Sequence, residues 1–222
     1  MGNTLLKDHL PVNYPIPYQD QVDLLEKLLG ALHLTQVQLV GLSYGGGIAL
    51  PFAQEHPGRV QRLILMAPFT EALKAQDQWI QDEVAANRLA FPFNPASDDE
   101  LYDFYLRQFI YSTYPAAEPV VLENPYILEG VFRMVQGIRH FRADTVLGGI
   151  EAPVFLMTGD QDQYIPQEVL EHLWKVLPKK IRASRLQIAF SEHKIPEAVP
   201  DFAAAWVLEC LRNPLLTTGK TF

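Results

Sequence analysis

Residues 37–47 read Val37-Gln-Leu-Val-Gly41-Leu-Ser43-Tyr-Gly45-Gly-Gly47. The first six are uncharged and of strand length, and the glycines after the serine lead into an apolar stretch that ends near His56. The pattern predicts a strand, a tight turn at Ser43 and a helix. A G-x-S-x-G element in this context presents the serine hydroxyl above a sheet. We expect Gly41 and Gly45 to be required because neighbouring backbone lies too close for a Cβ atom.

The strand-and-helix alternation continues on both sides of this element. A helix is predicted before it, and three further apolar segments of strand length follow it. The last two of these are each followed by a helical pattern. Nearly continuous apolar strands that alternate with helices are typical of a parallel sheet covered on both faces, so we predict an α/β fold. The helices are predicted at Tyr18–Leu34, Gln167–Leu177 and Glu197–Leu211, and the strands at Arg62–Ala67, Val154–Thr158 and Leu186–Phe190.

The alternation stops between Pro68 and Ile150, where only helical patterns occur. We predict a helical insertion at 69–150 in a core formed by 1–68 and 151–222. More than half of the chain's 24 aromatic residues lie in this insertion. Two interpretations stay open: they pack a small helical module, or some of them line an apolar pocket. The predicted helices are Glu71–Leu89, Asp98–Tyr114 and Ile127–Phe141, and the candidate pocket residues are Phe91, Phe93, Tyr105, Phe109 and Tyr111.

The composition excludes several classes of function. A formal net charge of −8 disfavours binding to phosphate backbones, so we expect no nucleic-acid partner. The single cysteine, Cys210, excludes an intramolecular disulfide and a Cys-rich zinc site, and no histidine pair has metalloprotease spacing. We therefore expect no metal and no cofactor. The chain shows no signal-peptide pattern and no apolar run near the roughly 20 residues of a membrane span, so we expect a cytoplasmic protein without a membrane partner.

A serine hydroxyl needs a base to take its proton, and the base needs an acid to orient it. Asp162 follows the third predicted strand and His193 follows the fourth, so both are expected at the carboxyl edge of the sheet, where open α/β sheets build their sites. The order Ser43, Asp162, His193 matches the template of such triads. The backbone N–H of Tyr44 is the expected oxyanion donor. Asp160 is an alternative acid, and Glu192 could compete for His193.

These residues resemble the α/β-hydrolase superfamily, in particular its capped serine hydrolases related to esterases, C–C bond hydrolases and cofactor-free haloperoxidases. The resemblance extends from about Tyr18 to Leu211. By this likeness Ser43 is the nucleophile, Asp162 the orienting acid, His193 the general base and the helical insertion the cap. The resemblance implies hydrolysis of an ester or related carbonyl bond, and the aromatic content of the insertion points to a small apolar or aromatic substrate. The motifs that carry it are Gly-Leu-Ser-Tyr-Gly-Gly from Gly41, His-Pro-Gly-Arg-Val from His56, Gly-Asp-Gln-Asp from Gly159 followed by Pro166, and the late His193.

The chain departs from this family in three places. About 17 residues precede the helix before the elbow, and no His-Gly pair occurs to supply a second oxyanion donor, whose loss costs about 10²–10³ in rate. The strand Val37–Leu42 is then expected to have an unpaired edge through which a homodimer could form. Pro51 should kink the elbow helix, and Glu192 stands where a small residue is more usual. The rival hypothesis is a catalytically impaired binding domain.

Overall fold

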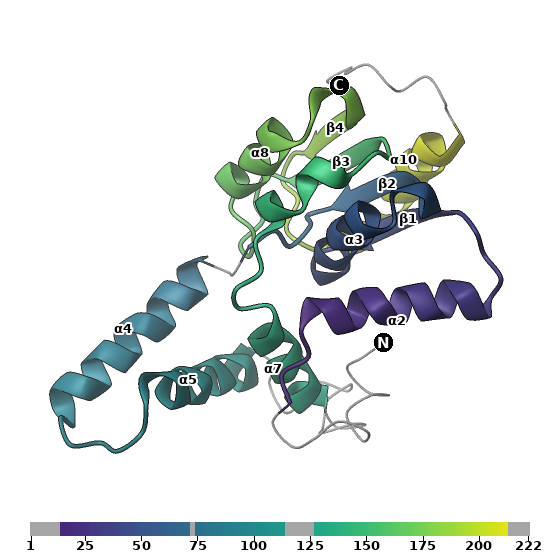
Figure 1. Cartoon of the computed structure of the whole chain (residues 1–222). Helices are drawn as coiled ribbons and strands as arrows, with labels where there is room; N and C mark the ends of the chain where they lie inside the picture. The colour runs from purple at the N-terminus through teal and green to yellow at the C-terminus, as the bar shows by residue number, and fades with distance from the viewer. Residues whose placement is uncertain (1–13, 72–73, 114–126, 213–222) are drawn as a thin grey trace. The chain divides into compact units, whose positions relative to one another are not determined.

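The computed structural model describes residues 14–71, 74–113 and 127–212 (Figure 1). Contacts between Cα atoms divide the chain into two compact units. A helical unit comprises residues 1–21 and 72–140, and a sheet unit comprises residues 22–71 and 141–222. The boundaries of the insertion at 69–150 stay a prediction.

The sheet unit contains four parallel strands in the order β1-β2-β3-β4. β3 is buried along its whole length, whereas β1 and β4 form the two edges. Each strand begins a strand–loop–helix step, which is the connection that parallel strands need. The arrangement confirms the α/β fold with a parallel sheet. The strands are β1 Val37–Leu42, β2 Val60–Met66, β3 Val154–Gly159 and β4 Arg182–Ile188.

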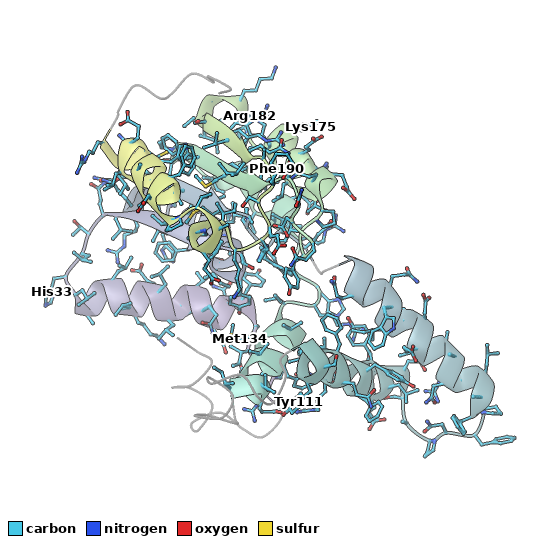
Figure 2. All side chains as sticks on the ribbon, turned by 180° about the vertical axis from the view of Figure 1, so that it is seen from behind. His33, Tyr111, Met134, Lys175, Arg182 and Phe190 are labelled. Atoms are coloured by element: carbon cyan, nitrogen blue, oxygen red, sulfur yellow. The ribbon has the colours of Figure 1, made fainter. Side chains whose placement is uncertain are left out.

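Helices cover both faces of this sheet. Views from opposite sides show α3 in front in one and α10 in front in the other (Figures 1 and 2). On the α10 face, Ile64, Phe155 and Ala183 pack with the buried Cys210. The helices and 3₁₀ turns are α2 Tyr18–Ala31, α3 Tyr44–Glu55, η2 Pro57–Arg59, η3 Ala143–Thr145, η4 Leu147–Gly149, α8 Gln167–Val176, η5 Lys179–Ile181, α9 Ile195–Ala198 and α10 Pro200–Arg212.

Helix α3 continues through Pro51, which is buried inside it. A proline in a helix interior removes one backbone donor. The helix nevertheless reaches Glu55, because its apolar face is packed: Leu50 and Phe52 are fully buried. Tertiary burial therefore outweighs the unfavourable intrinsic propensity at this position.

The edge strand β1 carries no charged residue and no proline. Its Gln38 is exposed and Val40 is 45% exposed. Edge strands are usually protected by charges, prolines or outward-facing bulges. β1 therefore has neither charges nor prolines to protect its outer edge.

The helical unit contains α4 Lys74–Ala90, α5 Asp98–Thr113 and α7 Ile127–Gly137. Its core is a cluster of buried side chains from these three helices, including Ile80, Tyr102, Leu106 and Phe132. The predicted helix of residues 98–114 ends at Thr113, and Tyr114 lies outside the described residues. The predicted helix from Ile127 ends at Gly137, four residues early.

Candidate active site

The turn between β1 and α3 holds Ser43 in a strained backbone conformation. Its φ is 50° and its ψ is −120°, outside the regions that side-chain-bearing residues normally occupy. Three backbone hydrogen bonds fix it: the Ser43 N–H donates to the Met66 carbonyl (3.0 Å), while Gly47 (3.1 Å) and Phe69 (2.8 Å) donate to the Ser43 carbonyl. Strain of this kind persists only where surrounding structure enforces it, and it clusters at functional sites.

The glycines around Ser43 differ from the prediction at one position. A Cβ on Gly41 would lie 2.7 Å from Gly46 Cα, so Gly41 is required, as the sequence predicts. A Cβ on Gly45 would meet nothing within 4 Å, so the steric reason given for Gly45 was wrong. Gly46 has that role instead, because a Cβ there would lie 2.7 Å from Pro68 Cβ. The close approach is between the elbow helix and the chain leaving β2, and the five-residue motif does not show it.

Asp162 and His193 are brought into direct contact. His193 Nδ1 lies 2.8 Å from Asp162 Oδ2. The Asp162 side chain is fully buried and that of His193 is 12% exposed. An ionised carboxylate only accepts hydrogen bonds, so Nδ1 carries the proton and Nε2 is left as the acceptor. Asp162 makes the contact with His193, whereas the two alternative partners, Asp160 and Glu192, are both exposed.

The electrostatic environment keeps Asp162 ionised. Burial alone would raise the pKa of this carboxyl, but the hydrogen bond with His193 and the backbone N–H groups of Ile165 and Tyr164 outweigh it, and its pKa is lowered. Both N–H groups donate to Oδ1 at 2.9 Å, which leaves Oδ2 for the imidazole. Asp162 thereby also stabilises the turn that follows it, as Asp side chains commonly do.

The loop after β4 extends across the end of β3 toward β1. Ile195, two residues after His193, is fully buried in a cluster with Met66, Ala67 and Met157. Leu42, the residue before Ser43, packs against the same cluster. Leu42 and Ile195, which lie close in sequence to Ser43 and His193, therefore share one apolar cluster although β1 and β4 are at opposite edges of the sheet. Within the described residues no hydrogen bond joins the Ser43 hydroxyl to His193.

Two residues that lie near Asp162 and His193 were assigned no role from the sequence. Gly159 ends β3, and a Cβ there would lie 2.3 Å from the Ser191 carbonyl oxygen, so only glycine lets the His193 loop pass. A glycine at a strand end is the available signal for such an approach. Tyr164 stands edge-on to His193, with ring centroids 5.2 Å apart. No spacing rule pointed to that contact.

The five aromatic residues considered for an apolar pocket in the insertion differ in exposure. Phe91 is 62% exposed, Phe93 is 96% exposed and Tyr111 is 45% exposed (Tyr111 is labelled in Figure 2). Tyr105 and Phe109 pack against the core of the helical unit, where Trp79 contacts both rings. The packing interpretation thus holds for Tyr105 and Phe109, and a pocket role for any of the five residues stays a prediction.

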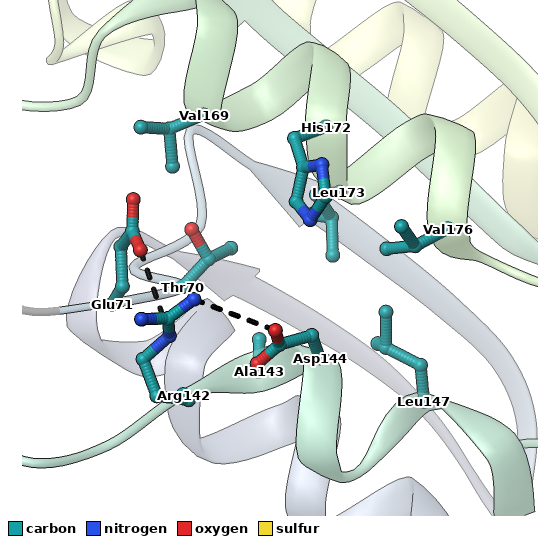
Figure 3. A pocket seen from close by; sticks show the side chains of 10 residues that line it. All are labelled: Thr70, Glu71, Arg142, Ala143, Asp144, Leu147, Val169, His172, Leu173 and Val176. Atoms are coloured by element: carbon teal, nitrogen blue, oxygen red, sulfur yellow. Dashed lines mark hydrogen bonds and ion pairs between the residues drawn. The ribbon is translucent and has the colours of Figure 1, made fainter.

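A small pocket in the sheet unit has a cavity volume of about 20 Å³, enough for about one water molecule, and is partly open to solvent. It begins at Thr70, the residue after Phe69, whose N–H binds the Ser43 carbonyl. Figure 3 shows Arg142 between two carboxylates at its rim; Arg142 lies 3.6 Å from Glu71 and 3.4 Å from Asp144. The remaining lining residues are Ala143, Leu147, Val169, His172, Leu173 and Val176.

Thr70 gives this pocket a polar atom. The residue is 6% exposed, and its hydroxyl has no hydrogen-bond partner within the described part of the chain. An unsatisfied buried hydroxyl is unfavourable, so a polar group entering the pocket would gain a ready partner. Elsewhere in the described residues, no cluster of three or more histidine, cysteine or acidic side chains could hold a metal ion. No described helix is both long and apolar enough to cross a bilayer.

Comparison with known proteins agrees with this arrangement. A family model described as alpha/beta hydrolase fold matches residues 11–197. The chain is 32% identical over 152 residues to a 2-hydroxymuconate semialdehyde hydrolase of Pseudomonas sp. (strain CF600), a match covering 63% of this chain and 50% of the relative. The chain thus spans about half the length of that relative.

Solved structures show the same fold at lower identity. An alpha/beta hydrolase enzyme from a Medee basin deep-sea metagenome library is 21% identical, with a TM-score of 0.63 and coverage of 90% of this chain and 73% of that one. A thermophilic esterase from Thermogutta terrifontis is 22% identical, with a TM-score of 0.60 and coverage of 91% and 74%. At these identities the likeness is one of fold.

Proposed function

The chain belongs to the alpha/beta hydrolase fold family, and from this membership and the geometry of its strand ends we propose that it is a serine hydrolase. The observation that carries the proposal is the buried Asp162–His193 hydrogen bond of 2.8 Å, on a loop anchored beside the strained Ser43 turn. Nothing in the packing of a surface loop requires a fully buried carboxylate against an imidazole. An acid that fixes the tautomer of a base does require it.

In the proposed mechanism Ser43 attacks the carbonyl carbon of the substrate. His193 Nε2 accepts the hydroxyl proton and returns it to the leaving group, while Asp162 stabilises the imidazolium. The oxyanion of the tetrahedral intermediate lies at the amino end of α3, where the N–H of Tyr44, the first residue of the helix, supplies a donor. Water then attacks the acyl-enzyme in the same way and releases the acid.

For the substrate we propose a short acyl group. The pocket beside Thr70 has a cavity volume of only about 20 Å³, far below the roughly 300–1,000 Å³ of most ligand sites, so it leaves no room for a long acyl chain, and Leu147, Val169 and Leu173 give it apolar walls. A series of p-nitrophenyl esters of increasing chain length tests this. We expect kcat/KM to be highest for acetate to butyrate and to fall at longer chains. The substrate that names the curated relative, 2-hydroxymuconate semialdehyde, belongs in the same series.

Active-site labelling tests the reaction class. A fluorophosphonate probe forms a covalent bond with an activated serine, so the wild-type chain should label and the Ser43→Ala variant should not. Ser191→Ala is the matched control, because Ser191 is a second buried serine near His193 whose hydroxyl faces the Glu192 carbonyl. Labelling that persists in Ser43→Ala would reject Ser43 as the nucleophile. A folded wild-type chain that does not label would reject the hydrolase proposal and leave the binding-domain hypothesis.

A further inference from the structure

The hairpin between α4 and α5 ends in an exposed apolar tip. Its sequence from Leu89 to Phe93 is Leu-Ala-Phe-Pro-Phe. Leu89 is 86% exposed, Phe91 is 62% exposed and Phe93 is 96% exposed. We call Leu89, Phe91 and Phe93 the apolar tip. Single exposed apolar residues are ordinary, but three together on one turn are not, and such patches mark binding surfaces.

The backbone that carries the tip is held rigidly. Arg88 donates to Asp98 (2.7 Å), to the Asn94 carbonyl (3.0 Å) and to the Ala96 carbonyl. Asn94 Nδ2 donates to Asn87 Oδ1 at 2.9 Å. These bonds close the loop without using any side chain of the tip.

A capping box fixes the start of α5 on the other side of the loop. Ser97 Oγ accepts from the Glu100 N–H at 3.2 Å, and the Ser97 N–H donates to Glu100 Oε2 at 2.7 Å. The loop is thus ordered before any partner arrives, although its apolar side chains contact little within the chain. Preorganisation of this kind lowers the entropic cost of binding.

The size of the tip decides which class of partner fits. With about 200 Å² for each whole side chain, the three residues expose about 500 Å². A stable protein–protein interface needs about 800 Å² from each partner. The tip is smaller than that and protrudes as a loop, so a second protein surface would have to supply a matching cavity. A lipid layer needs no preformed cavity, because its acyl chains pack around any apolar side chain that reaches them.

The charges beside the tip narrow the class of lipid. Arg88 is paired with Asp98, and Arg139 lies 3.3 Å from Asp99. Glu100 adds a further carboxylate in the same helical turn, and hydrogen bonds from Ser97 hold its pKa below the usual range. Among these described residues the flank therefore has one negative charge in excess, and both of its cations are already paired and not free for an anionic headgroup.

We propose that the apolar tip inserts into the surface of an uncharged or zwitterionic lipid layer. This inference is independent of the proposed hydrolase activity, and it revises the sequence-based expectation of no membrane partner. Insertion of the tip requires no membrane-spanning segment. The protein is then a peripheral one, and weak, reversible partitioning is expected from three side chains.

Flotation with phosphatidylcholine vesicles tests the proposal on the full chain. Wild-type protein should float with the vesicles, and Phe93→Ser should lower the partition coefficient about 10-fold or more, since it removes one buried phenyl ring. Phe190→Ser is the matched control: Phe190 is 84% exposed on the sheet unit (Figure 2) and should leave partitioning unchanged. Phosphatidylglycerol vesicles should bind less protein than phosphatidylcholine.

A second variant places a reporter at the tip. Phe93→Trp should show a blue shift with phosphatidylcholine, and brominated lipid should quench its emission in the difference spectrum against wild type. The proposal would be overturned if the wild type does not float, or if Phe93→Ser and Phe190→Ser lower the partition coefficient equally. Stronger binding to phosphatidylglycerol than to phosphatidylcholine would also overturn it. Two further results would overturn the proposal, because each would show that protein covers the tip. One is a Phe93→Trp emission that is already blue-shifted without lipid. The other is a dimer that the Phe93→Ser substitution abolishes.

Discussion

Replacing Gly46 and Gly45 by alanine, one at a time, should change stability in opposite directions. At Gly46 the new Cβ would lie 2.7 Å from Pro68 Cβ and 2.9 Å from Pro68 Cα. Non-bonded carbon atoms prefer a distance of 3.5–4.0 Å, so the helix and Pro68 would have to move apart by about 1 Å. Phe69, the next residue, is held to the Ser43 carbonyl by a 2.8 Å hydrogen bond, which opposes that movement.

The expected magnitude follows from these contacts. Overpacking at a site that cannot relax costs about 1–3 kcal/mol of unfolding free energy. At Gly45 the Cβ meets open space and the residue lies in α3 with negative φ, so alanine should stabilise the helix by up to about 1 kcal/mol. Each kcal/mol corresponds to about 2–4 °C in Tm for a chain of this size.

Urea unfolding of both variants and the wild type, with esterase turnover measured in parallel, checks the prediction. We expect Gly46→Ala to unfold at lower urea and to lose turnover as Ser43 is displaced, with Gly45→Ala at or above the wild-type midpoint. If the two variants unfold at the same urea concentration, or if Gly45→Ala is the less stable, the steric assignment at the elbow is refuted.

Three further predictions concern the acid, its titration and the sheet edge. Asp162→Asn should lower kcat about 10⁴-fold by favouring the wrong tautomer of His193, with Asp160→Asn near wild type; equal losses would contradict the assignment. The pKa of Asp162 is lowered in the folded chain, so its carboxylate adds stability that is complete above the usual aspartate value of about 3.9 and is lost as pH falls through the lower folded pKa. The gap in urea midpoint between wild type and Asp162→Asn should accordingly narrow toward pH 3, and a constant gap would refute it. If the chain pairs through β1, sedimentation should show a dimer that Val40→Lys converts to a monomer; a wild-type monomer rejects that pairing.

The strands could be predicted from sequence where apolar runs were continuous. β3 differs from its predicted range by only one residue at its end, because a strand buried on both faces has a nearly uniform apolar sequence. β1 also has the predicted bounds, although it is a partly exposed edge strand. β4 begins at Arg182, four residues before the predicted start. Three of its first four residues are polar, so they form no apolar run and the criterion overlooked them, although Ala183 and Ser184 are buried.

The Asp162–His193 contact was predictable because both residues follow strands that are neighbours in a parallel sheet. The requirement for glycine at position 46 could not be predicted, because it arises from the close passage of Pro68. That contact joins two segments, and the local motif contains only one of them. The packing of the aromatic residues in the insertion could not be predicted for a similar reason. Composition showed that they are concentrated there, but only the packing of α4 against α5 shows that Tyr105 faces inward and Phe93 outward.

The chain's single thiol has a practical consequence. Cys210 is fully buried, and burial raises its pKa to about 12, so almost none of it is thiolate near neutral pH. Maleimide reagents should therefore leave the native protein unmodified, and no background cysteine has to be removed before one is introduced elsewhere. A spin label or dye attached at position 93 or 45 would report from that site alone, in an otherwise unaltered molecule.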